Sequence, residues 1–195
     1  MARKLPQPIT HEDFEKLLTE AKKQREYFRK PSGGLSPRGE RFNQYIIAMV
    51  LAYGAGMRIS EIIGFKDKVP ILTKDKVESN FIRVVSGKGG KDRQVPLPGK
   101  LFIAAGVKRE DFRNNLPLTV SRRAIQTYFE QLGDKVLKKH ITFHMFRHGF
   151  VTHALESGID IHQVQMFAGH SRMDTTGLYL HANPKQALDK YEEKF

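Results

Sequence analysis

The apolar run from Tyr45 to Met57 is the sequence feature that most limits what this chain can fold into. Gly54 and Gly56 interrupt the run and Arg58 ends it, so it falls well short of the ~20 residues that a membrane-spanning helix needs. The sequence therefore predicts a core helix of a globular protein. A length of 195 residues is enough for about one domain around that helix.

Charge and cysteine content narrow the class of protein. Lys and Arg number 33 against 21 Asp and Glu, and the resulting net charge of +12 indicates a polyanionic partner, with nucleic acid the first choice. The stretch from Arg83 to Arg123 holds ten basic and three acidic residues, so the charge is concentrated there. The chain has no cysteine, which excludes disulfides, thiolate catalysis and cysteine-ligated metals and is compatible with a reducing cytoplasm. The first residues show no apolar signal region, so an intracellular, cytoplasmic protein is expected.

Helix and turn signals predict an α+β fold that is mainly helical, with one small antiparallel sheet. Thr10 is the expected cap of a helix that ends near Lys30. Pro37 is the expected first residue of the core helix, and Arg58 opens a short third one. Further helices are expected over about 119–137, 144–157, 160–167, 175–181 and from 184 onward.

The sheet is expected to be a hairpin with a basic tip. Phe81–Val85 is rich in β-branched residues, and Arg93–Leu97 has the pattern of a returning strand. The glycines at 87–90 predict the turn between them, and Lys88 and Lys91 place positive charge on it.

Arg58 and Glu61 form the first polar pair of chemical interest. They lie one helical turn apart, so the carboxylate can hold the guanidinium while other N–H donors stay free for an oxyanion such as phosphate. An ordinary surface ion pair accounts for the same spacing.

A second group lies on one helix, where His144 and Arg147 share a face that could grip a phosphate. His144 and His148 have the spacing of metal ligands, but a zincin helix needs Glu after the first histidine and Met145 stands there, so no metal is expected. A third group pairs His170 with Tyr179; taken alone, a tyrosine in an amphipathic helix is most often a core residue.

Together and in this order, these motifs resemble the catalytic domain of the tyrosine recombinases, the phage-integrase and Xer-like family. The resemblance covers nearly the whole chain. The motifs that carry it are Gly56-Met-Arg58-Ile-Ser-Glu61, Gly87-Lys88-Gly-Gly-Lys91-Asp-Arg93, His144-x-x-Arg147-His148, Gly169-His170-Ser171 and Tyr179.

The resemblance implies an enzyme that breaks and rejoins DNA without metal, ATP or other cofactor. Tyr179 would attack a backbone phosphate and form a 3′-phosphotyrosyl link while a 5′-hydroxyl leaves. His144 would accept the tyrosine proton and His170 would orient the phosphate. The implied catalytic set is Arg58, Lys88, His144, Arg147, His170 and Tyr179, with Glu61 in support.

In the same resemblance Arg58 and Arg147 clamp the phosphate, and Lys88 protonates the leaving oxygen, with Lys91 as its nearest competitor. Expected partners are duplex DNA and other copies of the chain, as a homotetramer on DNA, with no membrane. The residues expected to bind DNA are Lys91, Arg93, Arg122 and Arg123.

Residues 1–195 are expected to form a single catalytic domain, with a motif-bearing core at 9–182 and a last helix at 183–195 that could contact a neighbouring protomer. Family members usually carry a separate N-terminal core-binding domain, and almost nothing precedes the catalytic domain here, which leaves a fragment and a minimal enzyme both open. Phe167-Ala-Gly169 and Gly177 depart from the usual pattern.

Two other functions stay open on the sequence. The helices at 147–157 and 160–167 resemble a helix-turn-helix, which would suit a non-catalytic DNA-binding or regulatory protein. Type IB topoisomerases use similar chemistry, so DNA relaxation is the second alternative.

Overall fold

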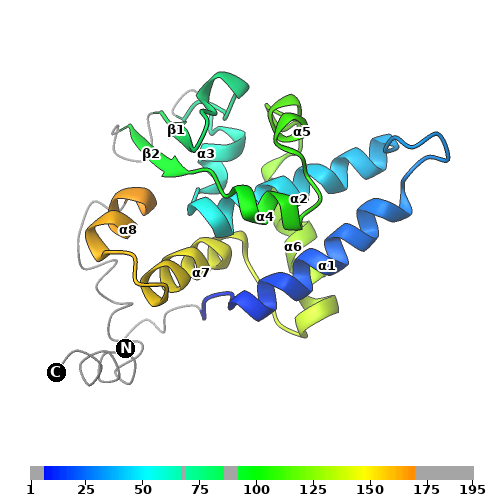
Figure 1. The fold of residues 1–195 in the computed structure, drawn as a ribbon. Helices are drawn as coiled ribbons and strands as arrows, with labels where there is room; N and C mark the ends of the chain where they lie inside the picture. The colour runs from blue at the N-terminus through cyan, green and yellow to red at the C-terminus, as the bar shows by residue number, and fades with distance from the viewer. Residues whose placement is uncertain (1–6, 67–68, 86–91, 170–195) are drawn as a thin grey trace.

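The structure, a computed structural model, describes residues 7–66, 69–85 and 92–169 (Figure 1). Over these ranges the chain is mainly helical, with one two-stranded antiparallel sheet, as predicted. The elements are α1 (His11–Tyr27), α2 (Pro37–Ala55), α3 (Ile59–Ile63), a 3₁₀ turn (Lys74–Lys76), β1 (Phe81–Val84), β2 (Arg93–Pro96), α4 (Gly99–Ala104), α5 (Arg109–Asn114), α6 (Arg122–Leu137), α7 (Phe143–Glu156) and α8 (Ile161–Ala168).

The core helix is α2, and it packs against α1 on one side and α7 on another. Its start is set by Ser36, whose hydroxyl accepts a hydrogen bond from the backbone of Gly39 at 3.2 Å, and by Pro37 in the first turn. From Tyr45 to Tyr53 every residue of the helix is buried, which confirms the predicted core helix. No helix in the described part of the chain is long and apolar enough to cross a membrane.

The first helix begins where the sequence predicts but ends earlier. The Thr10 hydroxyl accepts from the Asp13 backbone at 3.1 Å and caps α1, which buries Phe14 and Leu17 against the core. The helix ends at Tyr27 rather than near Lys30, because the chain turns back so that Arg29 pairs with Leu35 in an isolated β-bridge.

The segment between the sheet and α6 differs most from the prediction. Two short helices, α4 and α5, lie in a stretch for which the sequence analysis predicts no helix. Each is anchored by one buried ring, and the Phe102 and Phe112 rings stack 4.5 Å apart. The predicted start of α6 near Thr119 is wrong. The backbone N–H groups of Thr119 and Val120 donate to the Gln44 side chain, and the helix begins only after Ser121, which caps it.

The hairpin and the last described helices bring distant segments to one end of the molecule. β1 and β2 pair in the register that matches Ile82 with Val95 and Val84 with Arg93. α7 and α8 form close to the predicted ranges, and α8 packs against β2 (Figure 1). The turn at 87–90 and the helices expected at 175–181 and from Pro184 lie outside the described residues.

Gly56 supports a prediction about stability. It ends α2 in the left-handed conformation, at φ 62°, and a Cβ there would lie 2.5 Å from Cδ1 of Phe150. We expect Gly56→Ala to lower the free energy of unfolding by at least ~2 kcal/mol, from backbone strain and overpacking together. Denaturant unfolding followed by circular dichroism measures this loss. Gly34→Ala is the control, since a Cβ at Gly34 meets nothing within 4 Å, and an equal loss in both variants would contradict the assignment.

Candidate active site

Arg58 sits at the start of α3 and is held there by Glu61. The Arg58 backbone N–H donates to Oε2 of Glu61 at 2.7 Å, and Nη1 of its side chain donates to Oε1 at 2.8 Å. The Glu61 residue is only 3% exposed, so this pair is not the ordinary surface ion pair that the spacing left open. The guanidinium is therefore fixed at the helix start before any ligand arrives.

Arg93 occupies an interior position beside the same carboxylate. Its Nη1 and Nη2 donate to Oε1 and Oε2 of Glu61 at 2.9 and 2.8 Å, a bidentate pair, and its side chain is 8% exposed. Three of the five N–H groups of Arg93 thus donate within the fold, and its expected contact with DNA stays a prediction. Sequence reasoning missed the pair because the two residues are 32 positions apart.

The two arginines control the charge state of Glu61. Burial alone would raise the pKa of this carboxyl group, but the hydrogen bonds and charge of Arg93, followed by those of Arg58, hold its pKa at about 2. Glu61 is thus ionised throughout the neutral range.

Arg147 is the most deeply buried cation of the site, at 2% exposure on α7. Its Nη1 donates to the carbonyl oxygen of Gly56 at the end of α2, and its Nη2 donates to that of Ala168 at the end of α8. Burial, followed by the charge of Arg58, lowers the pKa of Arg147 to about 9, which still leaves it protonated at neutral pH.

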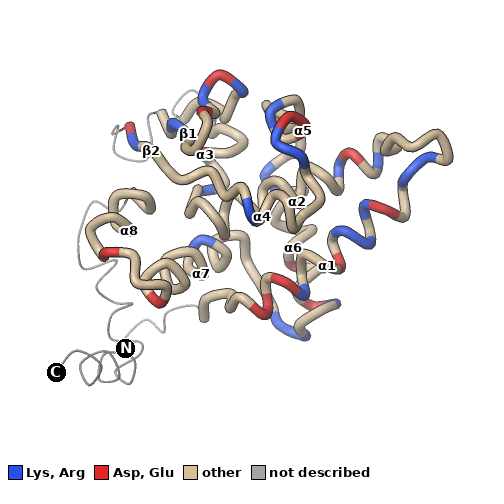
Figure 2. Tube along the Cα trace, in the orientation of Figure 1, with Lys and Arg blue, Asp and Glu red and all other residues tan. Residues whose placement is uncertain are grey.

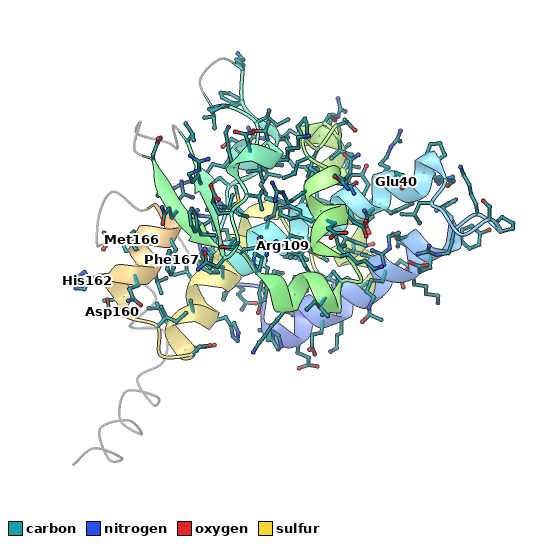
Figure 3. All side chains as sticks on the ribbon, turned by 45° about the horizontal axis from the view of Figure 1, so that its top comes forward. Glu40, Arg109, Asp160, His162, Met166 and Phe167 are labelled. Atoms are coloured by element: carbon teal, nitrogen blue, oxygen red, sulfur yellow. The ribbon has the colours of Figure 1, made fainter. Side chains whose placement is uncertain are left out.

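Three successive carbonyl groups at the end of α8 each accept a hydrogen bond from an arginine. Arg93 Nε donates to Phe167 at 2.8 Å, Arg147 to Ala168, and Arg58 Nη2 to Gly169 at 3.0 Å. Figure 3 shows Phe167 on the side of α8 that faces the domain and His162 on the outer side. Nothing in the local sequence of α8 signals this arrangement, because all three donors come from other elements.

His144 lies on α7 one turn before Arg147 and remains exposed. Its ring meets that of His148 edge to face, with centroids 4.5 Å apart. Partial desolvation, followed by the charges of Arg147 and Arg58, lowers the pKa of His144. Desolvation beside His144 also lowers the pKa of His148, to about 4. Both imidazoles are therefore neutral at neutral pH.

Arg58, His144 and Arg147 line one pocket of about 260 Å³. Arg122 and Gln126 come to it from α6, and the sequence offered a signal for Arg122 alone, as a basic residue. Arg123, the next residue, is exposed on the same helix. The remaining wall residues are Met57, Ile59, Ser60, Thr142 and Phe143.

The other residues that the resemblance implies cannot be placed. Lys88, Lys91, His170 and Tyr179 lie outside the described ranges. Of the six implied catalytic residues, the structure thus brings together Arg58, His144 and Arg147.

A pocket with two arginines and a histidine in this order along the chain can be compared with known proteins. The model of the phage integrase family matches residues 7–186. The chain belongs to the phage integrase family. Xer tyrosine recombinases are among the proteins to which it is similar.

Two of these recombinases illustrate the match. The tyrosine recombinase XerA of Thermococcus onnurineus is 32% identical over 99% of this chain and 67% of its own length. XerD of Staphylococcus aureus is 35% identical over 73% of the chain and 52% of its own length. The chain therefore spans about half to two thirds of the length of these recombinases.

Solved structures agree on the fold of this integrase-family chain. A crystal structure of XerA recombinase has a TM-score of 0.66 at 27% identity, covering 98% of this chain and 66% of that one. The catalytic domain of bacteriophage HP1 integrase has a TM-score of 0.56 at 21% identity and is covered over 95% of its length. These matches confirm the predicted fold class.

The buried pair at Glu61 yields a prediction about stability and pH. The pKa of about 2 lies below the ordinary value of 4.5, so the carboxylate stabilises the fold fully above about pH 4.5 and loses this contribution as the pH falls toward 2. We expect Glu61→Gln to lower the free energy of unfolding at neutral pH by about 3 kcal/mol, since two arginines lose their counterion.

Denaturant unfolding of wild type and Glu61→Gln at about pH 6 and about pH 3 measures this contribution. The difference between the two proteins should shrink at the lower pH. Glu130→Gln, at an exposed site on α6, is the matched control and should change stability little at either pH. A difference for Glu61→Gln that stays constant with pH would contradict the assigned charge state.

Proposed function

We propose that this chain is a site-specific DNA recombinase that cuts and rejoins strands through a covalent bond between Tyr179 and a DNA phosphate. The observation that carries the proposal is the pocket in which Arg58 and Arg147 lie beside His144. Two guanidiniums at one small pocket suit a single phosphodiester, whose negative charge they can share. Membership of the integrase family supports the same chemistry.

The two arginines supply the binding and the charge stabilisation. A guanidinium has five N–H donors, and the protein contacts of Arg58 and Arg147 each use one N–H of Nη1 and one of Nη2. Donors therefore remain for the two non-bridging oxygens of the phosphate. As the phosphorus becomes five-coordinate these oxygens gain charge, and preorganised donors of this kind contribute several kcal/mol.

The covalent step follows the roles that the resemblance implies. A bond forms between the Tyr179 hydroxyl oxygen and phosphorus while the bond from phosphorus to the 5′-oxygen breaks. A phenol with a pKa near ~10 is a poor nucleophile at neutral pH, so His144, whose lowered pKa keeps it neutral, would take the phenol proton. Lys88 would give a proton to the leaving 5′-oxygen. The phosphotyrosyl bond preserves the free energy of the phosphodiester for rejoining.

In this proposal the chain acts on duplex DNA and is active as a homotetramer assembled on that DNA. Arg122 at the pocket, with the exposed Arg123 beside it, offers positive charge to the DNA backbone next to the cleaved phosphate. Structures with the same fold include XerH bound to a difH substrate and the Tn1549 integrase bound to transposon end DNA.

The covalent intermediate is the direct test. We expect wild-type protein, incubated with a duplex nicked near the cleavage position, to yield a protein–DNA adduct that survives denaturing electrophoresis without added metal or ATP. Tyr179→Phe should abolish the adduct because the attacking oxygen is gone. Tyr27→Phe, at an 82% exposed tyrosine at the end of α1, is the matched control and should leave the adduct unchanged.

Two outcomes would redirect the assignment. An adduct that persists in Tyr179→Phe would move the nucleophile to another residue. Tight DNA binding without any adduct would favour the non-catalytic DNA-binding alternative. Relaxation of supercoiled DNA without strand exchange would favour topoisomerase-like activity instead.

Assembly gives a second prediction. The segment from Pro184 to Lys194 carries Ala187, Leu188 and Tyr191 at helical spacing, and we propose that it docks onto a neighbouring protomer. Deleting residues 184–195 should therefore reduce the mass of the complex on DNA, measured by light scattering, while a single protomer still binds. An unchanged mass would rule the contact out.

A further inference from the structure

The C-terminus of α8 depends on charges from elsewhere in the fold. A helix ends in carbonyl groups without intrahelical partners and with partial negative charge, which cations near the last turn stabilise. α8 has no lysine, arginine, aspartate or glutamate of its own, and its tube in Figure 2 is tan throughout. Its last carbonyls instead accept hydrogen bonds from arginines at the start of α3, on β2 and on α7.

Arg93 differs from the other two arginines in what it touches. Arg58 and Arg147 line the pocket, whereas the side chain of Arg93, 8% exposed, is absent from the described pocket wall. Two of its nitrogens grip both oxygens of Glu61, and its third nitrogen, Nε, donates to the Phe167 carbonyl. The Arg93 guanidinium thus connects Glu61, which holds Arg58, to the end of α8.

We propose that Arg93 is a positioning residue for DNA cleavage, which joins the phosphate clamp to the C-terminus of α8. Through Glu61 it fixes the Arg58 guanidinium, and through the Phe167 carbonyl it fixes the turn at Gly169. The same end of α8 accepts hydrogen bonds from Arg58 and Arg147, the two clamp residues. The inference rests on the proposed recombinase function.

Gly169 provides an independent sign that this contact is built into the fold. A Cβ at Gly169 would lie 3.0 Å from Nε and 3.1 Å from Cζ of Arg93, so with any other residue there the guanidinium would have to shift by a few tenths of an ångström. Gly169 also holds the left-handed conformation, at φ 61°, that ends α8. Both the hydrogen bond to the Phe167 carbonyl and the close approach at Gly169 place the Arg93 guanidinium against this turn.

The test separates positioning from DNA contact. Adduct formation is measured in single turnover with saturating nicked duplex, and DNA affinity is measured separately over a range of salt concentrations. We expect Arg93→Ala to slow adduct formation about 100-fold, as displacement of a catalytic group by about 1 Å does, with the dissociation constant and its salt dependence unchanged. Arg93→Lys keeps the positive charge but loses the planar group that binds Glu61 bidentately, and it should slow adduct formation about 10-fold.

The matched control is Arg83→Ala, which removes an exposed arginine from the partner strand β1. It should leave the rate of adduct formation unchanged. Hydrogen exchange of the free protein adds a measurement that needs no activity. Arg93→Ala and Arg93→Lys should both speed exchange in the last turn of α8, while Arg83→Ala should not.

Two results would overturn the inference. One is a wild-type rate of adduct formation in Arg93→Ala. The other is weaker DNA binding with a salt slope reduced by about 1, which is the signature of a phosphate contact. If wild-type protein forms no adduct, the proposed function fails. In that case, hydrogen exchange in α8 that is the same in Arg93→Ala as in wild type would still contradict the positioning role of Arg93.

Discussion

The rest of the site depends on one buried carboxylate. Glu61 accepts four hydrogen bonds, from the backbone and side chain of Arg58 and from both terminal nitrogens of Arg93. A charge at this depth is tolerated only when it is paired, and breaking such a pair is costly. Because Arg58 opens α3 and Arg93 lies on β2, the same pairing fixes the hairpin to the short helix that carries the phosphate-facing guanidinium.

The three arginines donate hydrogen bonds to two kinds of acceptor, a carboxylate and backbone carbonyls. Glu61 is the single carboxylate among the described contacts of Arg58, Arg93 and Arg147, and their other acceptors are backbone carbonyls. A carbonyl can orient a guanidinium without neutralising it. The cluster therefore keeps surplus positive charge beside the pocket, and the lowered pKa of Arg147 reflects that surplus as well as burial. An incoming phosphodiester would supply the missing negative charge.

Local patterns allowed the prediction of the parts whose partners are near in sequence. The core helix, the cap at Thr10 and the pairing of Arg58 with Glu61 depend on residues within one helix or one turn. The bidentate pair of Arg93 with Glu61 was not predicted, because the two residues lie 32 positions apart. The start of α6 is decided by Gln44, 75 residues from Thr119. Such distant contacts leave no periodicity in the sequence.

Two glycines of the family motifs acquire a physical reason from the same contacts. Gly56 and Gly169 both end helices in the left-handed conformation; a Cβ at Gly56 would collide with the Phe150 ring, and one at Gly169 would crowd the Arg93 guanidinium. The Gly56 carbonyl accepts from Arg147, and Gly169 presents its own to Arg58 while making room for Arg93. At both positions the glycine therefore lets a helix end turn its carbonyl toward an arginine.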